Sequence, residues 1–418
     1  MVTETALSRF ADIKDALVSS HDDDSVNLLL PDLLKLQEVY IPSLGFFVVN
    51  MAEGNFSTKS VHLGYKPAAS NNFSVGYLYT RQNNPSRAQL EKAIALLENS
   101  KYALCYSSGT SAIASIVQLL SNGDHIVSSS IIFGGTFRYF DKIISRANVS
   151  TTYVDATDPS NVEKALQDNT KLVFLESVSN PLNTVCDIAK IAQIVRKRKD
   201  IIFAVDNTYL TPYFLKPLDL GAHVSVYSLT KYMNGHDDVC MGAVCFSEEE
   251  LYPKIKFLQN NAGLNPSPFD CYLVYRGLRT LPLRLLKHQK NSLEVAKFLE
   301  SHPRVTKVMH PWLPSHPGHE LAKRQFKGYT GMVAFYVKGD LGETSAFLKR
   351  LELISMCGSL GGVASIVEIP SVLSHASIPQ QMRDKVGITD NLVRLSVGVE
   401  DVEDIIADLD QTLKKMSN

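Results

Sequence analysis

Short apolar runs alternate with helical segments through the middle of the chain. Each run is four to six residues long, which is the length of a buried strand. The clearest runs are Tyr102–Tyr106, His125–Ser129, Leu172–Glu176, Ile201–Asp206 and Val224–Tyr227. This alternation predicts an α/β fold in which helices cover a mainly parallel sheet.

The pattern changes beyond about Arg276. A long amphipathic helix is expected over Leu285–Ser301, followed by proline-rich turns. A strand at Gly331–Val337, a helix at Gly342–Leu351 and a closing helix at Val402–Met416 come next. This second pattern predicts a smaller α+β domain at the C-terminus.

The start of the chain fits neither pattern. Residues 1 to about 52 read as a separate piece with a helical stretch at Leu28–Gln37. We therefore divide the chain into an N-terminal extension and arm (1–75), a large domain (76–285) and a small C-terminal domain (286–418).

Composition narrows the choice of ligand. The 418 residues are 45% hydrophobic and carry a formal net charge of -1. A nearly neutral chain gives no reason to expect nucleic acid as a partner, and a small molecule fits better. The longest apolar stretch near the start, Ile41–Met51, is too short for a bilayer, which takes roughly 20 residues, so no membrane contact is expected.

The six cysteines lack the short paired spacings of a zinc site or a disulfide scaffold. We expect reduced thiols and no metal. The acidic run Asp22–Asp24 argues against a signal or transit peptide, and the expected compartment is the cytoplasm.

A small-residue turn follows the first apolar run. Ser107-Ser-Gly-Thr110 leads into a helix expected over Ser111–Leu120. Free amides at a helix N-terminus favour an anion, Gly109 permits close approach, and Thr110 adds a hydroxyl. The turn therefore suits a phosphate, although serine and threonine also serve simply as helix caps.

A carboxylate ends the fourth apolar run. Asp206 falls at the carboxyl edge of the expected sheet, where open α/β sheets bind ligands. Such a group pairs well with a pyridinium nitrogen. The alternative is a helix-capping aspartate.

Lys231 lies just past the fifth run, between hydroxyl residues on its N-terminal side and a glycine-containing loop. Burial disfavours an ammonium and prepares an amine for imine formation, while Ser228 and Thr230 offer hydroxyls to a phosphate. Taken alone, a single lysine is more often a solvated surface charge.

Six segments together resemble one family, the Cys/Met-metabolism enzymes that depend on pyridoxal 5'-phosphate (PLP). They are Tyr79-Thr-Arg81-Gln-Asn-Asn-Pro85, Ser107-Ser-Gly-Thr110, Phe133-Gly-Gly-Thr136, Asn180-Pro181, Asp206-Asn-Thr208 and Ser228-Leu-Thr-Lys-Tyr-Met-Asn-Gly-His236. The resemblance spans about residues 56 to 416. It implies fold type I, with a seven-stranded sheet in the large domain, and PLP as the cofactor.

The resemblance also implies roles for individual residues. Lys231 would carry PLP as a Schiff base and move protons, and Asp206 would hold the ring nitrogen. The remaining expected cofactor contacts are Gly109, Thr110, Ser228 and Thr230 at the phosphate, Asn180 at the 3-oxygen, and Phe133 on the ring.

Other segments are implied in substrate binding and assembly. Arg394 would bind the substrate carboxylate with a two-pronged contact, beside Ser359 and Asn180. In relatives, residues matching Tyr79 and Arg81 reach the phosphate of a neighbouring subunit. This implies at least a dimer, and usually a homotetramer (a dimer of dimers), with shared sites.

Three features depart from the family pattern. Phe133 stands where a tyrosine is usual, so its phenol is missing and proton handling would fall to Tyr79 or Lys231. Gly358 replaces a glutamate that helps γ-lyases of the family read the distal amino group. The segment between Gly64 and Tyr79 is shorter than usual.

The resemblance predicts a carbon–sulfur lyase that cleaves L-cystathionine by γ-elimination. The products would be cysteine, 2-oxobutanoate and ammonia, and related thiols would release hydrogen sulfide. One alternative is a γ-replacement enzyme acting on an activated homoserine, as a γ-synthase or sulfhydrylase does. Another is a catalytically weak PLP-binding paralogue.

Overall fold

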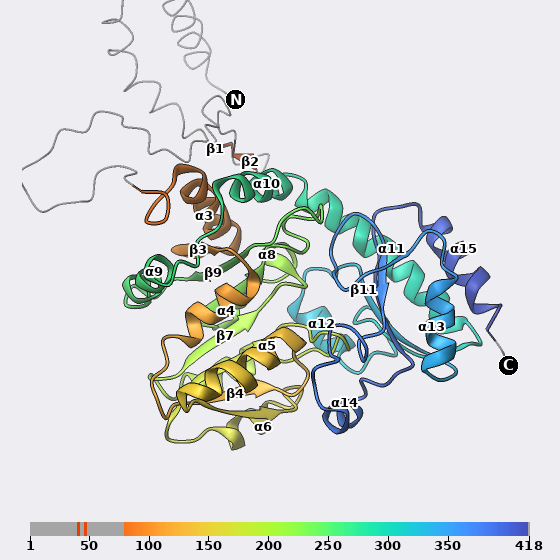
Figure 1. Cartoon of the computed structure of the whole chain (residues 1–418), viewed down its shortest axis with the longest axis horizontal. Coiled ribbons are helices and arrows are strands. Elements are labelled where there is room, and N and C mark those ends of the chain that lie inside the picture. The colour runs from red at the N-terminus through yellow and green to blue at the C-terminus, as the bar shows by residue number, and fades with distance from the viewer. Residues whose placement is uncertain (1–39, 42–45, 48–78, 417–418) are drawn as a thin grey trace, which may run out of the picture. The chain divides into compact units, whose positions relative to one another are not determined.

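The computed structural model describes residues 40–41, 46–47 and 79–416 (Figure 1). The chain falls into two units, Met1–Phe56 and Ser57–Asn418. In the first unit, strand β1 (Tyr40–Ile41) pairs antiparallel with β2 (Phe46–Phe47). The predicted helix at Leu28–Gln37 and the shortened segment before Tyr79 lie outside the described residues.

A seven-stranded sheet forms the centre of the large domain, in the order β3-β9-β8-β7-β6-β4-β5. Strand β9 runs antiparallel to both of its neighbours, and the other neighbouring pairs are parallel. The predicted mainly parallel, seven-stranded sheet is confirmed. The strands are β3 (Tyr102–Tyr106), β4 (His125–Ser129), β5 (Ser150–Val154), β6 (Thr170–Glu176), β7 (Ile202–Asp206), β8 (Val224–Ser228) and β9 (Gly242–Phe246).

Helices cover both faces of this sheet. Along β6, Leu172 and Phe174 pack in one apolar cluster, and Val173 and Leu175 pack in another on the opposite face. Burial on both faces explains why the strands read as continuous apolar runs. The helices and helical turns are α3 (Pro85–Glu98), α4 (Gly109–Val117), α5 (Gly134–Arg138), η2 (Tyr139–Ile143), η3 (Ile144–Ala147), α6 (Pro159–Ala165), α7 (Ile188–Val195), α8 (Thr211–Phe214), η4 (Pro217–Leu220), α9 (Leu251–Asn261) and α10 (Pro268–Leu278).

A five-stranded sheet follows in the C-terminal part, in the order β10-β11-β14-β13-β12, and its elements are cyan to blue in Figure 1. The strands are β10 (Val305–Met309), β11 (Met332–Val337), β12 (Ser355–Met356), β13 (Ile366–Glu368) and β14 (Leu392–Ser396). The helices are α11 (Leu281–Ser301), α12 (His319–Gln325), α13 (Leu341–Lys349), α14 (Gln380–Val386) and α15 (Val402–Leu413).

The predicted elements of this part are present with small shifts at their ends. Helix α11 begins at Leu281, four positions before the predicted start at Leu285, because Pro282 fits the first turn of a helix. It therefore runs through the predicted boundary at residue 285. The three-part division of the chain stays a prediction. No helix in the described part of the chain has the length and apolar character needed to cross a membrane.

The sheet brings candidate residues to one edge. Parallel strands β6, β7 and β8 are neighbours and end at Glu176, Asp206 and Ser228. Glu176 pairs in register with Asp206. The loops that leave these strand ends therefore build a site at the carboxyl edge of the sheet, as expected for an open α/β sheet.

Candidate active site

Lys231 lies in the turn that follows β8 and is partly buried. Its Nζ donates a hydrogen bond to Ser359 Oγ at 2.8 Å. Burial, and next the nearby charge of Arg394, lower the pKa of the lysine to about 8. A substantial fraction of this amine is therefore neutral near physiological pH, as a nucleophile or base requires.

The small-residue turn before α4 packs against the end of β8. Ser108 is the N-cap, and its hydroxyl accepts from the backbone N–H of Ser111. A Cβ on Gly109 would lie 2.9 Å from Ser228 Cβ, so only glycine fits this approach. The structure thus brings Gly109 and Ser228 together, with Thr110 next to them in the first turn of α4.

Thr230, two residues after Ser228, is held by the backbone of Met241. Its Oγ1 donates to the carbonyl of Met241 at 3.2 Å and accepts from the N–H of Met241 at 3.1 Å. The N–H of Ser228 donates to Thr208 Oγ1 at 2.7 Å. These bonds fix the backbone of the turn that carries Lys231.

Two carboxyl groups lie side by side at the sheet edge. Asp206 Oδ1 accepts from the N–H of Thr208 at 2.9 Å. Glu176 accepts from the N–H of Phe133 at 2.7 Å and from the N–H of Asn180 at 2.8 Å. Burial raises the pKa of both acids, and the nearby Asp206 raises that of Glu176 further.

Arg394 is buried, with 2% of its side chain exposed, and is held by three groups. It forms an ion pair with Glu368 at 2.9 Å, donates to Asn180 Oδ1 at 3.0 Å and donates to the carbonyl of Ser359 at 2.8 Å. Its Nε has no hydrogen-bond partner within the described residues. A planar guanidinium held in this way is suited to a carboxylate ligand.

Phe133 is the N-terminal residue before α5 and is 36% exposed. A Cβ on Gly135 would lie 2.4 Å from the Phe133 ring. The ring therefore occupies the space that a side chain at position 135 would need. The predicted contact of Phe133 with the cofactor ring stays a prediction.

Tyr79 and Arg81 are the predicted site residues that the structure does not bring to Lys231. Tyr79 is 57% exposed, and the Arg81 guanidinium lies 5.3 Å from the centre of its ring. Arg81 also donates to the carbonyl of Asn260 at 2.8 Å. Within residues 79–416, neither side chain hydrogen-bonds to Lys231 or to another predicted cofactor residue.

Sequence reasoning missed two buried acids of this site. Glu176 binds the backbone of two predicted cofactor residues, and Glu368 pairs with the predicted substrate arginine. Each is a single carboxylate at the end of an otherwise apolar strand, which is the signal that singled out Asp206. The same sequence pattern could therefore have identified Glu176 and Glu368.

The groups present fit PLP. The backbone amides of Gly109 and Thr110 in the first turn of α4, with the Ser228 hydroxyl, suit its phosphate, and Asp206 suits its ring nitrogen. Lys231 supplies an amine of lowered pKa for its aldehyde. Fold and site together define a PLP-dependent enzyme of fold type I.

Comparisons with known proteins agree with this class. The family model for "Cys/Met metabolism PLP-dependent enzyme" matches residues 54–414. The cystathionine gamma-lyase of Homo sapiens is 47% identical over 379 residues, or 86% of this chain and 94% of that protein. The one from Dictyostelium discoideum is 47% identical over 339 residues, or 81% of this chain and 87% of that protein.

Two solved structures are also similar. Cystathionine gamma-lyase from Lactobacillus plantarum, complexed with L-serine, has a TM-score of 0.82 at 34% identity, covering 91% of this chain and 97% of its own. The metB protein from Corynebacterium glutamicum has a TM-score of 0.83 at 37% identity, with coverages of 90% and 95%. The chain belongs to the Cys/Met metabolism family of PLP-dependent enzymes, and PLP is its cofactor.

Proposed function

We propose that the protein cleaves L-cystathionine by γ-elimination, with residue roles as predicted from the sequence. One observation carries this proposal most directly. Ser359 accepts from the Lys231 amine with its hydroxyl and from Arg394 with its carbonyl. A base and a carboxylate-binding cation are thus held at one residue, which is the arrangement needed to act on the α-carbon of an amino acid.

The overall reaction balances with one water. The Cγ–S bond of cystathionine breaks, the sulfur leaves with a proton as the thiol of cysteine, and Cγ gains a hydrogen. The amino group leaves as ammonia, and the remaining carbon chain becomes 2-oxobutanoate. When bound, PLP accepts the electron pair that remains on Cα after its proton is removed.

The residues of the chain divide the work. Arg394 binds the substrate carboxylate and Glu368 keeps the guanidinium plane fixed. The neutral Lys231 Nζ removes the proton from Cα and later returns a proton, while Ser359 Oγ orients the amine. Glu176 fixes the backbone on the two sides of the ring site, at Phe133 and Asn180.

The test is to identify the products that PLP-loaded protein forms from L-cystathionine by mass spectrometry. Equal amounts of cysteine and 2-oxobutanoate would support the proposal. Homocysteine with pyruvate would establish β-cleavage instead, and either that result or unchanged substrate would refute γ-elimination of cystathionine.

A γ-replacement enzyme is the second candidate. It is favoured by Gly358, which is exposed and has no side chain with which to read a distal amino group. Incubation with an O-acylated homoserine and cysteine decides between the two. Formation of cystathionine faster than its cleavage would favour replacement, whereas a protein that binds PLP but transforms neither substrate would be a weak paralogue.

We also propose a homotetramer with sites shared between subunits, located in the cytoplasm. The exposed Tyr79 and Arg81 support shared sites, because within residues 79–416 neither side chain hydrogen-bonds to Lys231. All six cysteines are free thiols, which suits a reducing compartment. Sedimentation velocity of the PLP-loaded protein tests the assembly state.

A further inference from the structure

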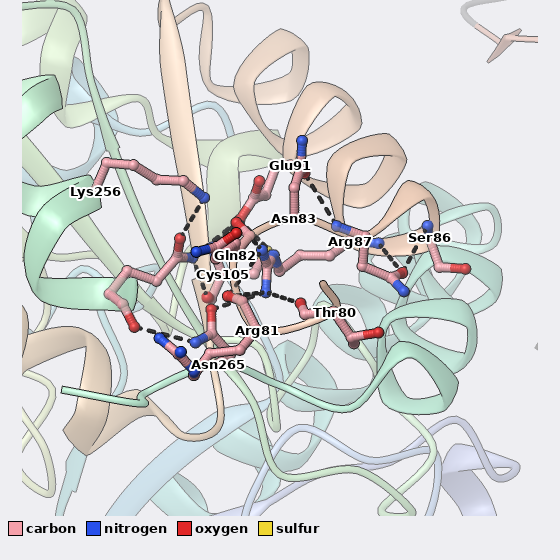
Figure 2. A network of polar contacts seen from close by, with 12 residues as sticks. Thr80, Arg81, Gln82, Asn83, Ser86, Arg87, Glu91, Cys105, Lys256 and Asn265 are labelled. Atoms are coloured by element: carbon pink, nitrogen blue, oxygen red, sulfur yellow. Dashed lines mark hydrogen bonds and ion pairs between the residues drawn. The ribbon is translucent and has the colours of Figure 1, made fainter. Parts of the chain in front are cut away.

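One buried guanidinium holds the exposed turn that begins at Tyr79. Arg87 lies in the first turn of α3 with only 1% of its side chain exposed. It donates to the carbonyl of Thr80 at 3.3 Å, of Arg81 at 3.4 Å and of Gln82 at 2.9 Å (Figure 2). Three consecutive carbonyl groups of the turn therefore converge on one side chain.

The guanidinium is itself fixed to the body of the large domain. Arg87 Nη1 donates to Asn265 Oδ1 at 2.8 Å, and Nε lies 3.7 Å from Glu91 Oε1. The same Glu91 oxygen accepts from the N–H of Cys105 in β3 at 2.8 Å. A chain of polar contacts, visible in Figure 2, thus joins the turn to the central sheet.

Arginine is specifically suited to this task. Its rigid fork of donors reaches several oxygens at once, and it stays charged when buried, whereas lysine offers a single point charge. Within the turn, the N–H groups of Gln82 and Asn83 both donate to the carbonyl of Tyr79, and the guanidinium of Arg87 adds contacts to the carbonyls that follow. Arg87 therefore ties the backbone of Thr80, Arg81 and Gln82, directly after Tyr79, to helix α3.

A buried ion pair alone is weak evidence of a stabilising role, because desolvation offsets much of the attraction. The direction of the donors is more informative. The terminal nitrogens of Arg87 face the carbonyls of a turn whose Tyr79 side chain is 57% exposed, rather than the apolar core. The contacts therefore fix the backbone of a turn that lies on the surface of the protein.

We propose that Arg87 is a positioning residue for the active site of a neighbouring copy of the chain. It presents Tyr79 and Arg81 in the geometry in which they contact the PLP phosphate of that copy. This inference rests on the shared site of the proposed function. Loss of Arg87 would therefore weaken cofactor binding at the neighbour's Lys231, and leave the site of its own chain intact.

The test compares two buried arginines in PLP-loaded oligomers. Arg284 donates to the carbonyl of Tyr232, the residue after Lys231, at 2.7 Å and to that of Gly277 at 2.8 Å. Arg87→Lys and Arg284→Lys both keep the positive charge but replace the planar guanidinium and its several donors with a single ammonium group. Each pure variant is expected to hold PLP about tenfold more weakly than the wild type, as for one lost charge-assisted hydrogen bond.

Hybrid oligomers distinguish a residue that acts on the neighbouring chain's site from one that acts on the site of its own chain. Each variant chain is co-expressed with a large excess of a Lys231→Ala chain carrying a different tag. Oligomers that hold a single variant chain are then purified through both tags. In the Arg87→Lys hybrid, the one intact Lys231 faces a turn from the Lys231→Ala chain, which keeps Arg87. PLP affinity at that site is expected to return to the wild-type value, whereas the Arg284→Lys hybrid should keep its tenfold loss.

An Arg87→Lys hybrid that keeps the weakened affinity would overturn the proposal, because Arg87 would then act on its own chain. Wild-type PLP affinity in pure Arg87→Lys oligomers would overturn it too. If Arg87→Lys does not fold by circular dichroism, Asn265→Ala, which removes one acceptor of the guanidinium, carries the same hybrid test.

Failure of the proposed function is recognised separately. It would appear in the wild type, as a monomer or as no cleavage of cystathionine. The PLP affinities of the hybrids do not depend on that turnover.

Discussion

Two regions predicted for the same site differ in how far one chain completes them. Around Lys231, the Ser359 hydroxyl accepts from the lysine and its carbonyl accepts from Arg394, which pairs with Glu368 and is 2% exposed. In the turn that begins at Tyr79, Arg87 holds the carbonyls of Thr80, Arg81 and Gln82, but Tyr79 is 57% exposed. A fixed backbone that carries exposed side chains is what we expect of a surface that binds another subunit.

The difference is also one of electrostatics. The Lys231 region carries buried charges that need partners inside the chain, because desolvated charges are costly when unpaired. Arg81 remains solvated and needs no such partner. The first region is thus fixed by folding, whereas the second acquires its contacts through the assembly that we propose.

Removing the lysine should have the largest effect. In Lys231→Ala, we expect kcat/KM for cystathionine to fall by about 10³-fold or more, because the amine that moves protons is lost. The visible absorption band of lysine-bound PLP should disappear as well. Lys254→Ala, at an exposed helix position, is the control and should behave as the wild type. Residual turnover near the wild-type rate would contradict the assignment.

Arg394→Lys should have the second-largest effect on the reaction with cystathionine. We expect KM to rise by about 100-fold with a smaller change in kcat, because lysine cannot make the two-pronged contact with a carboxylate. Steady-state kinetics measures both values. Arg324→Lys is matched, since Arg324 pairs with Asp187 at 2.8 Å but is 65% exposed. Equal effects from the two variants would show that the buried pair has no special part in substrate binding.

Gly109→Ala should weaken PLP binding by about tenfold, the size of one lost contact to the phosphate. Its Cβ would lie 2.9 Å from Ser228 Cβ and would push the two elements apart. Equilibrium dialysis against PLP measures the change. In the control Gly342→Ala, the new Cβ lies in α13, 3.2 Å from Asp340 Oδ1 and outside the predicted phosphate site. Unchanged affinity in Gly109→Ala would argue against a phosphate at this turn.

The pH dependence of cofactor capture should show the smallest effect. The pKa of Lys231 is lowered to about 8, and only the neutral amine reacts with an aldehyde. The rate at which cofactor-free protein takes up PLP should rise about fivefold from pH 7 to 8, and only about twofold more from pH 8 to 9. Stopped-flow absorbance follows this rate. A rise that continues steeply to pH 10 would mean an unperturbed lysine.

Most of the fold could be predicted because the central strands are apolar on both faces and separated by helices. Strands β3, β4, β6, β7 and β8 lie within two residues of their predicted ends. The reversed direction of β9 could not be predicted, since a buried antiparallel strand and a buried parallel strand have the same apolar pattern. The N-terminal helix lies outside the described residues.

The site was predictable where residues follow one another closely in sequence, as at Ser228, Thr230 and Lys231. Contacts between distant segments were not. Glu368 and Arg394 pair across neighbouring strands of the small sheet. The local sequence around each residue does not indicate that the other is its partner. Arg87 reads as an ordinary helix residue until its bonds to the turn are seen.

The central claim is that this site breaks the Cγ–S bond of cystathionine and adds a hydrogen at Cγ. Turnover of L-cystathionine in D₂O by PLP-loaded protein, followed by NMR of the products, tests it directly. The account predicts cysteine together with 2-oxobutanoate that carries deuterium on its methyl carbon, and neither product with Lys231→Ala. Pyruvate labelled on its methyl carbon, formed together with homocysteine, would contradict it.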